Sequence, residues 1–171
     1  MRIGYVCQTD RGATDRLLSE VAALLKAEGV VLAGAVQVNS GCADEPRCDM
    51  DLVVLPDGPV IRISQYLGAD SQGCRLDAGA LEQAVGLAMA RLTGAGLLVV
   101  NKFGKHESEG RGFRDLIAGA LGQGIPVLVG VNPRSLAAFR AFAGDLAEPL
   151  LAEPEALCLW CRAAQGEMAA G

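Results

Sequence analysis

The sequence predicts an α/β fold with a mainly parallel sheet, helices on both of its faces, and one added β-hairpin. Short apolar runs alternate along the chain with segments of helical periodicity, which is typical of parallel strands joined by helical crossovers. Hydrophobic residues make up 51% of the chain, enough to cover both faces of such a sheet. The length of 171 residues fits one core, so we expect a single domain over residues 1–171.

Each element has its own signal. Strands are expected at the apolar or β-branched runs 3–7, 30–38, 97–100 and 125–131, and a hairpin at 51–55 and 60–64 around a Pro/Gly turn. Helices are expected at 14–28, 77–93, 113–121 and 133–142, where apolar residues recur every three or four positions. Thr14 or Thr9 is the expected cap of the first helix and Asp77 that of the second. Residues 157–161 are expected to form one short element at an edge of the sheet.

Composition and charge narrow the classes of function. The formal net charge is −5 and only three lysines occur, so no basic block is available to bind a nucleic-acid backbone. No apolar stretch is long enough to span a membrane, and the first apolar run is too short for a signal peptide. We therefore expect a cytoplasmic protein with no nucleic-acid or membrane partner and with reduced cysteines. The sequence leaves a homo-oligomer open.

The loop after the first strand occupies the place of a Walker A phosphate loop. That loop has the pattern G-x-x-x-x-G-K-[ST], in which backbone amides surround phosphate, lysine neutralises it and the hydroxyl holds magnesium. Residues 7–14 read CQTDRGAT, so Cys7 replaces the first glycine and Ala13 replaces the lysine. The helix start that remains attracts anions, although an ordinary strand-to-helix turn is the alternative. The candidate binding residues are Thr9, Arg11, Gly12 and Thr14.

A second candidate site follows the strand at 97–100. A Walker B strand ends in an aspartate that holds magnesium, and here this position is Asn101, a poorer magnesium ligand. The loop at 102–112 brings two lysines and the only histidine to a carboxyl end of the predicted sheet, where ligands bind. Glu107 is the first candidate for a general base and His106 the second. The candidate anion-binding residues here are Asn101, Lys102, Lys105 and Arg111, and the alternative is a charged loop in solvent.

The cysteines suggest a metal-binding or redox module. Cys158 and Cys161 have C-x-x-C spacing, but they lie among apolar residues, which favours a pair of buried thiols. Cys74 lies in an irregular loop, and Cys7 ends the first strand beside the anion loop. Cys74 and Cys7 are therefore the candidate ligands for a soft metal.

The chain resembles two families. Its order of elements is similar to that of the small P-loop nucleoside-triphosphatase family of thermophiles, whose D-E-I-G-x-M-E segment corresponds to NKFGKHE at 101–107. Asn101 and Lys102 replace the aspartate and the catalytic-type glutamate of that segment, while Gly104 and Glu107 match. The chain also resembles an uncharacterised bacterial domain family often encoded beside molybdate-transport genes. That family carries N-[KR]-F-G-K-x-E-x-E-G-R-G, matched at 101–112, and G-C-R-L-D, matched at 73–77.

These resemblances imply a P-loop nucleotide-hydrolase fold and a small anionic ligand: a nucleotide, or an oxyanion such as molybdate or tungstate. The loss of the loop lysine and of the aspartate implies weak magnesium binding and little hydrolysis. The leading hypothesis is a binding protein with a degenerate phosphate loop that serves molybdenum handling. Three other hypotheses stay open. They are an active nucleoside triphosphatase in which Glu107 activates water, a cysteine-based metal or redox module, and a purely interacting subunit that dimerises through Leu- and Ala-rich faces.

Overall fold

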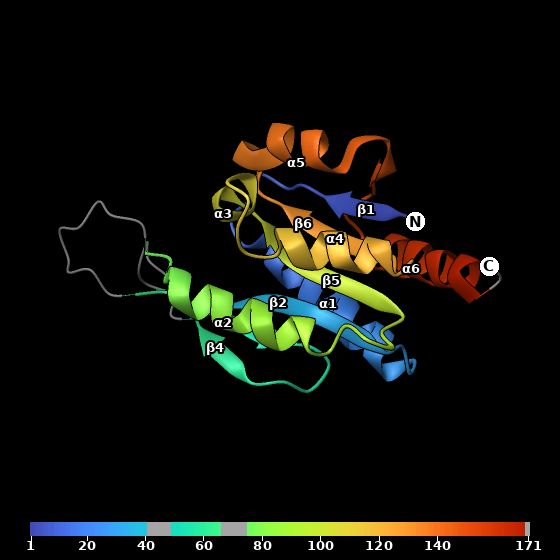
Figure 1. Cartoon of the computed structure of the whole chain (residues 1–171), viewed down its shortest axis with the longest axis horizontal. Helices are drawn as coiled ribbons and strands as arrows, with labels where there is room; N and C mark the ends of the chain where they lie inside the picture. Colours follow the sequence, from blue (N-terminus) through green and yellow to red (C-terminus); the bar gives the residue numbers. More distant parts are fainter. Residues whose placement is uncertain (41–48, 66–74, 170–171) are drawn as a thin grey trace.

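The protein is built around one seven-stranded sheet between two helical layers (Figure 1). The computed structural model describes residues 1–40, 49–65 and 75–169. The sheet has the strand order β4-β3-β2-β5-β6-β1-β7. The parallel strands are β1 (Ile3–Val6), β2 (Leu32–Ser40), β5 (Leu97–Phe103), β6 (Val127–Val131) and β7 (Ala147–Pro149). β3 (Asp49–Val54) and β4 (Val60–Arg62) add an antiparallel hairpin at one edge, so the predicted sheet and hairpin are confirmed.

Helices cover both faces of the sheet, as predicted. α1 (Ala13–Ala27) and α6 (Pro154–Ala169) pack on one face, and α2 (Ala78–Met89), α4 (Arg114–Gly122) and α5 (Leu136–Ala143) pack on the other. Three shorter helical segments are α3 (Lys105–Ser108), η1 (Pro133–Ser135) and η2 (Gly144–Leu146). Within the described ranges, no helix combines the length and apolar character needed to cross a bilayer.

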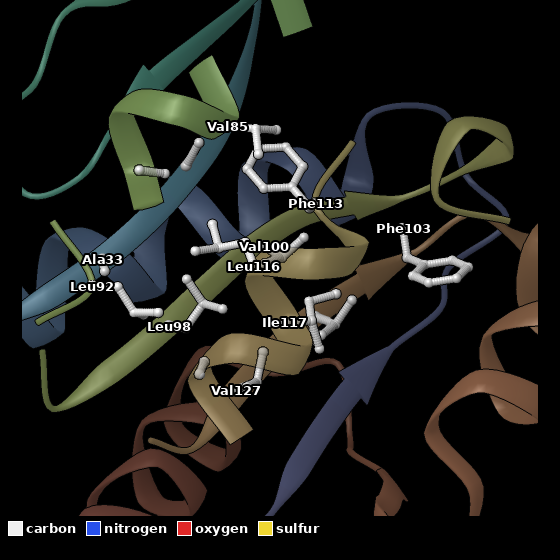
Figure 2. Packing of buried hydrophobic residues seen from close by; sticks show 14 of the residues in the cluster. Ala33, Val85, Leu92, Leu98, Val100, Phe103, Phe113, Leu116, Ile117 and Val127 are labelled. Carbon is white, nitrogen blue, oxygen red and sulfur yellow. The ribbon is translucent and has the colours of Figure 1, made fainter. Parts of the chain in front are cut away.

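The central strand β5 supplies side chains to both cores. Leu98 and Val100 pack against Leu116 and Ile117 of α4 (Figure 2). Leu97 and Val99 point to the opposite face, where α1 and α6 cover them. Because side chains alternate along a strand, a strand covered on both faces must be apolar at consecutive positions.

The ends of the chain's elements differ in places from the prediction. Neither Thr9 nor Thr14 caps α1: its N-cap is Gly12, and no side chain accepts a hydrogen bond there. Asp77 caps α2 as predicted, accepting from the Ala80 amide at 3.0 Å. Residues 157–161 belong to the 16-residue helix α6 and not to a short element. All of them except the exposed Leu159 pack in the core shared with α1. The strand at the edge beside β1 is β7, and an edge position tolerates its proline.

Candidate anion-binding site

A cavity of about 390 Å³ lies at the carboxyl ends of three parallel strands. This size is within the range of small-molecule pockets, about 300–1,000 Å³, and open α/β sheets bind ligands at this edge. The walls come from the loop after β1, the end of β5 and the turn after β6. The lining residues are Gln8, Thr9, Asp10, Arg11, Gly12, Thr14, Asp15, Lys102, Val131, Asn132, Pro133 and Arg134.

Helix α1 begins at this cavity without a side-chain cap. Gly12 has φ 70, in the left-handed region that glycine adopts without strain, and this turns the loop into the helix. The Gly12 carbonyl accepts from the Arg16 amide at 3.0 Å, which is the first intrahelical bond. The first amides of a helix have no intrahelical partner, and the helix dipole favours negative charge beside them. A helix start of this kind attracts anions.

Gly130 allows α1 to lie close to β6. A Cβ at this position would come within 2.7 Å of Thr14 Cγ2 and 2.8 Å of Leu18 Cδ1. The first turn of α1 therefore rests directly on the end of β6. The Thr14 hydroxyl lies 3.4 Å from Oε1 of Gln8 and so remains at the cavity wall.

Lys102 reaches the cavity from a bulge in β5. Asn101 pairs with Gly130 and Phe103 pairs with Val131, so Lys102 is an extra residue in β5. Bulges re-aim side chains, and here Nζ of Lys102 lies 3.3 Å from Oδ1 of Asp15 in the first turn of α1. A positive charge thus stands at the helix start even though the loop itself carries alanine in place of lysine.

Asp15 is a buried acid in the same cavity, with a side chain only 4% exposed. Its Oδ2 accepts from Asn39 Nδ2 at 2.7 Å, and Gln37 Nε2 lies at 3.5 Å. Both amides come from β2, while Lys102 comes from β5. A buried carboxylate is tolerated when it is paired and hydrogen-bonded in this way.

Asn101 lies beside this group without lining the cavity. It is 1% exposed, and neither polar atom of its side chain has a hydrogen-bond partner. A Cβ on Gly130 would be 3.4 Å from Asn101 Oδ1 and would also touch Thr14, so both side chains gather over Gly130. Buried amides are nearly always hydrogen-bonded, which makes this position unusual.

The structure brings together five of the eight predicted anion-binding residues: Thr9, Arg11, Gly12, Thr14 and Lys102. Asn101 lies next to them, as described above. Lys105 and Arg111 lie elsewhere, where both contact Glu109, and the Lys105 side chain is 86% exposed. The four predicted cations therefore do not converge, and only Arg11 and Lys102 share the cavity.

Several lining residues were not named from the sequence. Asn132 and Arg134 follow β6 directly and are not among the residues predicted from the sequence. The Asn132 side chain accepts from the Arg134 amide at 3.0 Å and thereby starts η1. A cation directly after a buried strand was the available signal for Arg134. Asp15 had no such signal, because its partner Lys102 is 87 residues away in the sequence.

Glu107 and His106 are not among the lining residues of the cavity. Glu107 is buried, and its carboxylate accepts from the amides of Gly104 at 2.8 Å and Phe113 at 3.1 Å. Burial raises the pKa of Glu107, although the two backbone hydrogen bonds oppose this rise. Nε2 of His106 is buried and has no hydrogen-bond partner. These hydrogen bonds tie Glu107 to the backbone of the loop around it. The catalytic role of Glu107 and His106 stays a prediction.

The described cysteines are free thiols. Cys158 and Cys161 are buried on α6, and burial raises the pKa of Cys161 to about 12. Cys7 is half-buried, and burial raises its pKa as well. Cys74 lies outside the described residues. In the described parts of the chain, no group of three or more His, Cys, Asp and Glu side chains is placed to hold a metal ion.

The fold is P-loop nucleotide-hydrolase-like. The chain is similar to the solution structure of a human cancer-related nucleoside triphosphatase, with a TM-score of 0.61 over 97% of this chain and 98% of that one. The two are 19% identical, so this likeness establishes the fold. Within that class, residues 3–160 match the family described as "Protein of unknown function (DUF2478)", and the chain belongs to this family. The resemblance to an uncharacterised P-loop-like family is thereby confirmed.

A further similarity extends over 98% of the chain. It is 36% identical, over 172 aligned residues, to the molybdenum import ATP-binding protein ModC 2 of Bradyrhizobium diazoefficiens. The match spans only 19% of the length of that protein. The ATP binding in its name is therefore not assigned to the matched segment.

Proposed function

We propose that the chain binds a nucleotide or a small oxyanion in the cavity at the start of α1, with little or no hydrolysis. The observation that carries the proposal is the uncapped helix start facing a cavity lined by Arg11, Lys102 and Arg134. Among the described residues, neither Arg11 nor Arg134 forms an ion pair, so both guanidinium groups are available to a ligand. Asp10 and Asp15 also line the cavity, but Asp15 is already paired.

Slow hydrolysis follows from the two replaced residues. Phosphoryl transfer depends on cations that neutralise the charge developing on the phosphate. Ala13 supplies no charge from the loop, and Asn101 is a neutral residue where an aspartate would hold magnesium. Binding needs neither of these groups, because helix amides and guanidinium groups bind anions without a metal.

A role in molybdenum handling is supported by the name of the curated relative and by the chemistry of the cavity. Molybdate and tungstate are tetrahedral dianions, and the same amides and guanidinium groups that bind phosphate suit them. A nucleotide is supported by the fold. Measuring the binding of each directly distinguishes oxyanions from nucleotides as the ligand.

The test is isothermal titration calorimetry of the folded chain with ATP, GTP, phosphate, molybdate and tungstate. We expect at least one ligand to bind, and Arg11→Ala and Arg134→Ala to weaken it about ten-fold or more, since a charge-assisted hydrogen bond contributes about 1.5–3 kcal/mol. Lys105→Ala is the matched control, because that lysine is exposed and lies outside the cavity. Absence of heat with all five ligands, or equal weakening by the control, would contradict the proposal.

A phosphate-release assay tests the hydrolytic part. We expect no release from ATP or GTP above the rate without protein. Release that is above this background and is lost in Glu107→Gln would instead establish an active nucleoside triphosphatase.

A further inference from the structure

We infer that Asp15 competes internally with the ligand for Lys102, and that this competition makes the cavity favour oxyanions of low charge over nucleoside triphosphates. The inference rests on the proposed function, since it concerns the same cavity. In this inference Asp15 determines which anions bind, and Lys102 supplies the positive charge of the lysine that the loop lacks.

Asp15 holds Lys102 by one oxygen only. Nζ of Lys102 is 3.3 Å from Oδ1, while Asn39 donates to Oδ2 at 2.7 Å. If Lys102 turned toward a bound anion, Asp15 would still keep its amide partners from β2. Lys102 is one-third exposed and lines the cavity, so its ammonium group can reach a ligand there. After the pair separates, Oδ2 of Asp15 therefore still accepts hydrogen bonds from β2.

The Asp15 carboxylate also occupies the favourable position in the first turn of α1. Negative charge in this turn interacts favourably with the helix dipole, and Asp15 supplies such a charge while the cavity is empty. An incoming anion must compete with Asp15 for this field as well as for Lys102. Coulomb repulsion grows with the charge of the ligand, so a triphosphate meets more of it than molybdate or phosphate does. Asp10, on the opposite side of Gly12 in the sequence, adds to this discrimination.

The side chain of Asn101 is independent evidence that a polar ligand binds at this end of α1. Its amide is buried, and both of its polar atoms are unpartnered beside Thr14, which lines the cavity. An anion oxygen seated near Thr14 would accept from Asn101 Nδ2. This observation does not depend on the helix start or on the cations.

The experiment compares the wild type with Asp15→Asn, Asp15→Ser, Lys102→Met and Asp15→Asn/Lys102→Met by calorimetry with molybdate, phosphate and ATP. We expect both Asp15 variants to bind molybdate and phosphate about ten-fold tighter or more, and to gain more for ATP. Lys102→Met binds all three more weakly. In the double variant the gain from replacing Asp15 is smaller than in the wild-type background, because no lysine is left to release. Lys105→Met, an exposed lysine outside the cavity, is the control with unchanged affinity.

The outcomes separate this inference from the proposed function. If the wild type binds an anion and neither folded Asp15 variant binds it more tightly, the inference is overturned and the proposed function stands. An equal gain for ATP and molybdate would also overturn it, because the discrimination by charge would then be absent. If no folded variant binds any of the three anions, the proposed function itself fails. Circular dichroism of each variant establishes that it is folded, and Asp15→Ser supplies a smaller neutral side chain if Asp15→Asn does not fold.

Discussion

Gly130 lies where β6 passes beneath the first turn of α1, and its replacement by alanine should destabilise the protein and weaken ligand binding together. A Cβ there would be 2.7 Å from Thr14 Cγ2 and 2.8 Å from Leu18 Cδ1. Carbon atoms pack at about 3.5–4.0 Å, so α1, or its Thr14 and Leu18 side chains, would have to move away from β6 by about 1 Å. Overpacking of this kind costs about 1–3 kcal/mol. The same displacement would carry the helix start away from the cavity walls on β5 and β6.

The assay is thermal unfolding followed by circular dichroism, with and without the best ligand found by calorimetry. For a chain of this length, 1 kcal/mol corresponds to about 2–4 °C, so we expect Tm to fall by about 2–12 °C. Gly86→Ala is the matched control, because Gly86 is exposed on α2 and a Cβ there would meet nothing within 4 Å. The control should gain about 0.5–1 kcal/mol. An unchanged or raised Tm in Gly130→Ala would refute the argument that α1 requires glycine beneath it.

The remaining predictions concern the buried acid, the buried thiols and one helix cap. Glu107→Gln should lose about 1–3 kcal/mol in urea denaturation, because its carboxylate accepts two backbone N–H groups and an amide can accept only one. Since burial raises the pKa of Glu107 in the folded state, its contribution is full below the unfolded pKa and declines as pH rises through the folded pKa. The stability margin over Glu107→Gln should therefore shrink from pH 5 to pH 8, and a margin that grows would contradict this reasoning. With a pKa of about 12, Cys161 should resist iodoacetamide at pH 8 until the chain is denatured, as mass spectrometry would show; rapid native labelling would count against its burial. Asp77→Ala should cost about 1 kcal/mol of unfolding free energy through loss of the α2 cap, and Asp77→Asn should restore most of it.

The sheet could be predicted because its strands are apolar at consecutive positions. Residues 97–100 and 127–129 have this pattern, since both faces of the sheet are covered. Helix α6 could not be predicted in full, because its apolar residues at 157–161 are nearly continuous and hide the helical period. The sequence does not predict β7, because its proline argues against a strand, whereas an edge position accommodates it.

The candidate site was predictable to the extent that it depends on the ends of strands. Thr9, Arg11, Gly12 and Thr14 follow the first strand directly, and the rule for α/β sheets places such residues at the ligand edge. The pairing of Asp15 with Lys102 depends on the bulge in β5, and a one-residue change of register has no signature in the sequence. The charged loop at 102–112 was treated as one unit, and the structure divides it between the cavity and the buried carboxylate of Glu107.

The position of β1 has a consequence for biosynthesis. Ile3 pairs with Val127 on one side and with Ala147 on the other, so β1 has no neighbour in the sheet until the distal part of the chain has left the ribosome. Pairing between such distant segments is slow and comes late in folding. The cavity is thus completed only in the closing stage of folding, and an anion that binds there as we propose would stabilise the finished protein without guiding its earlier steps.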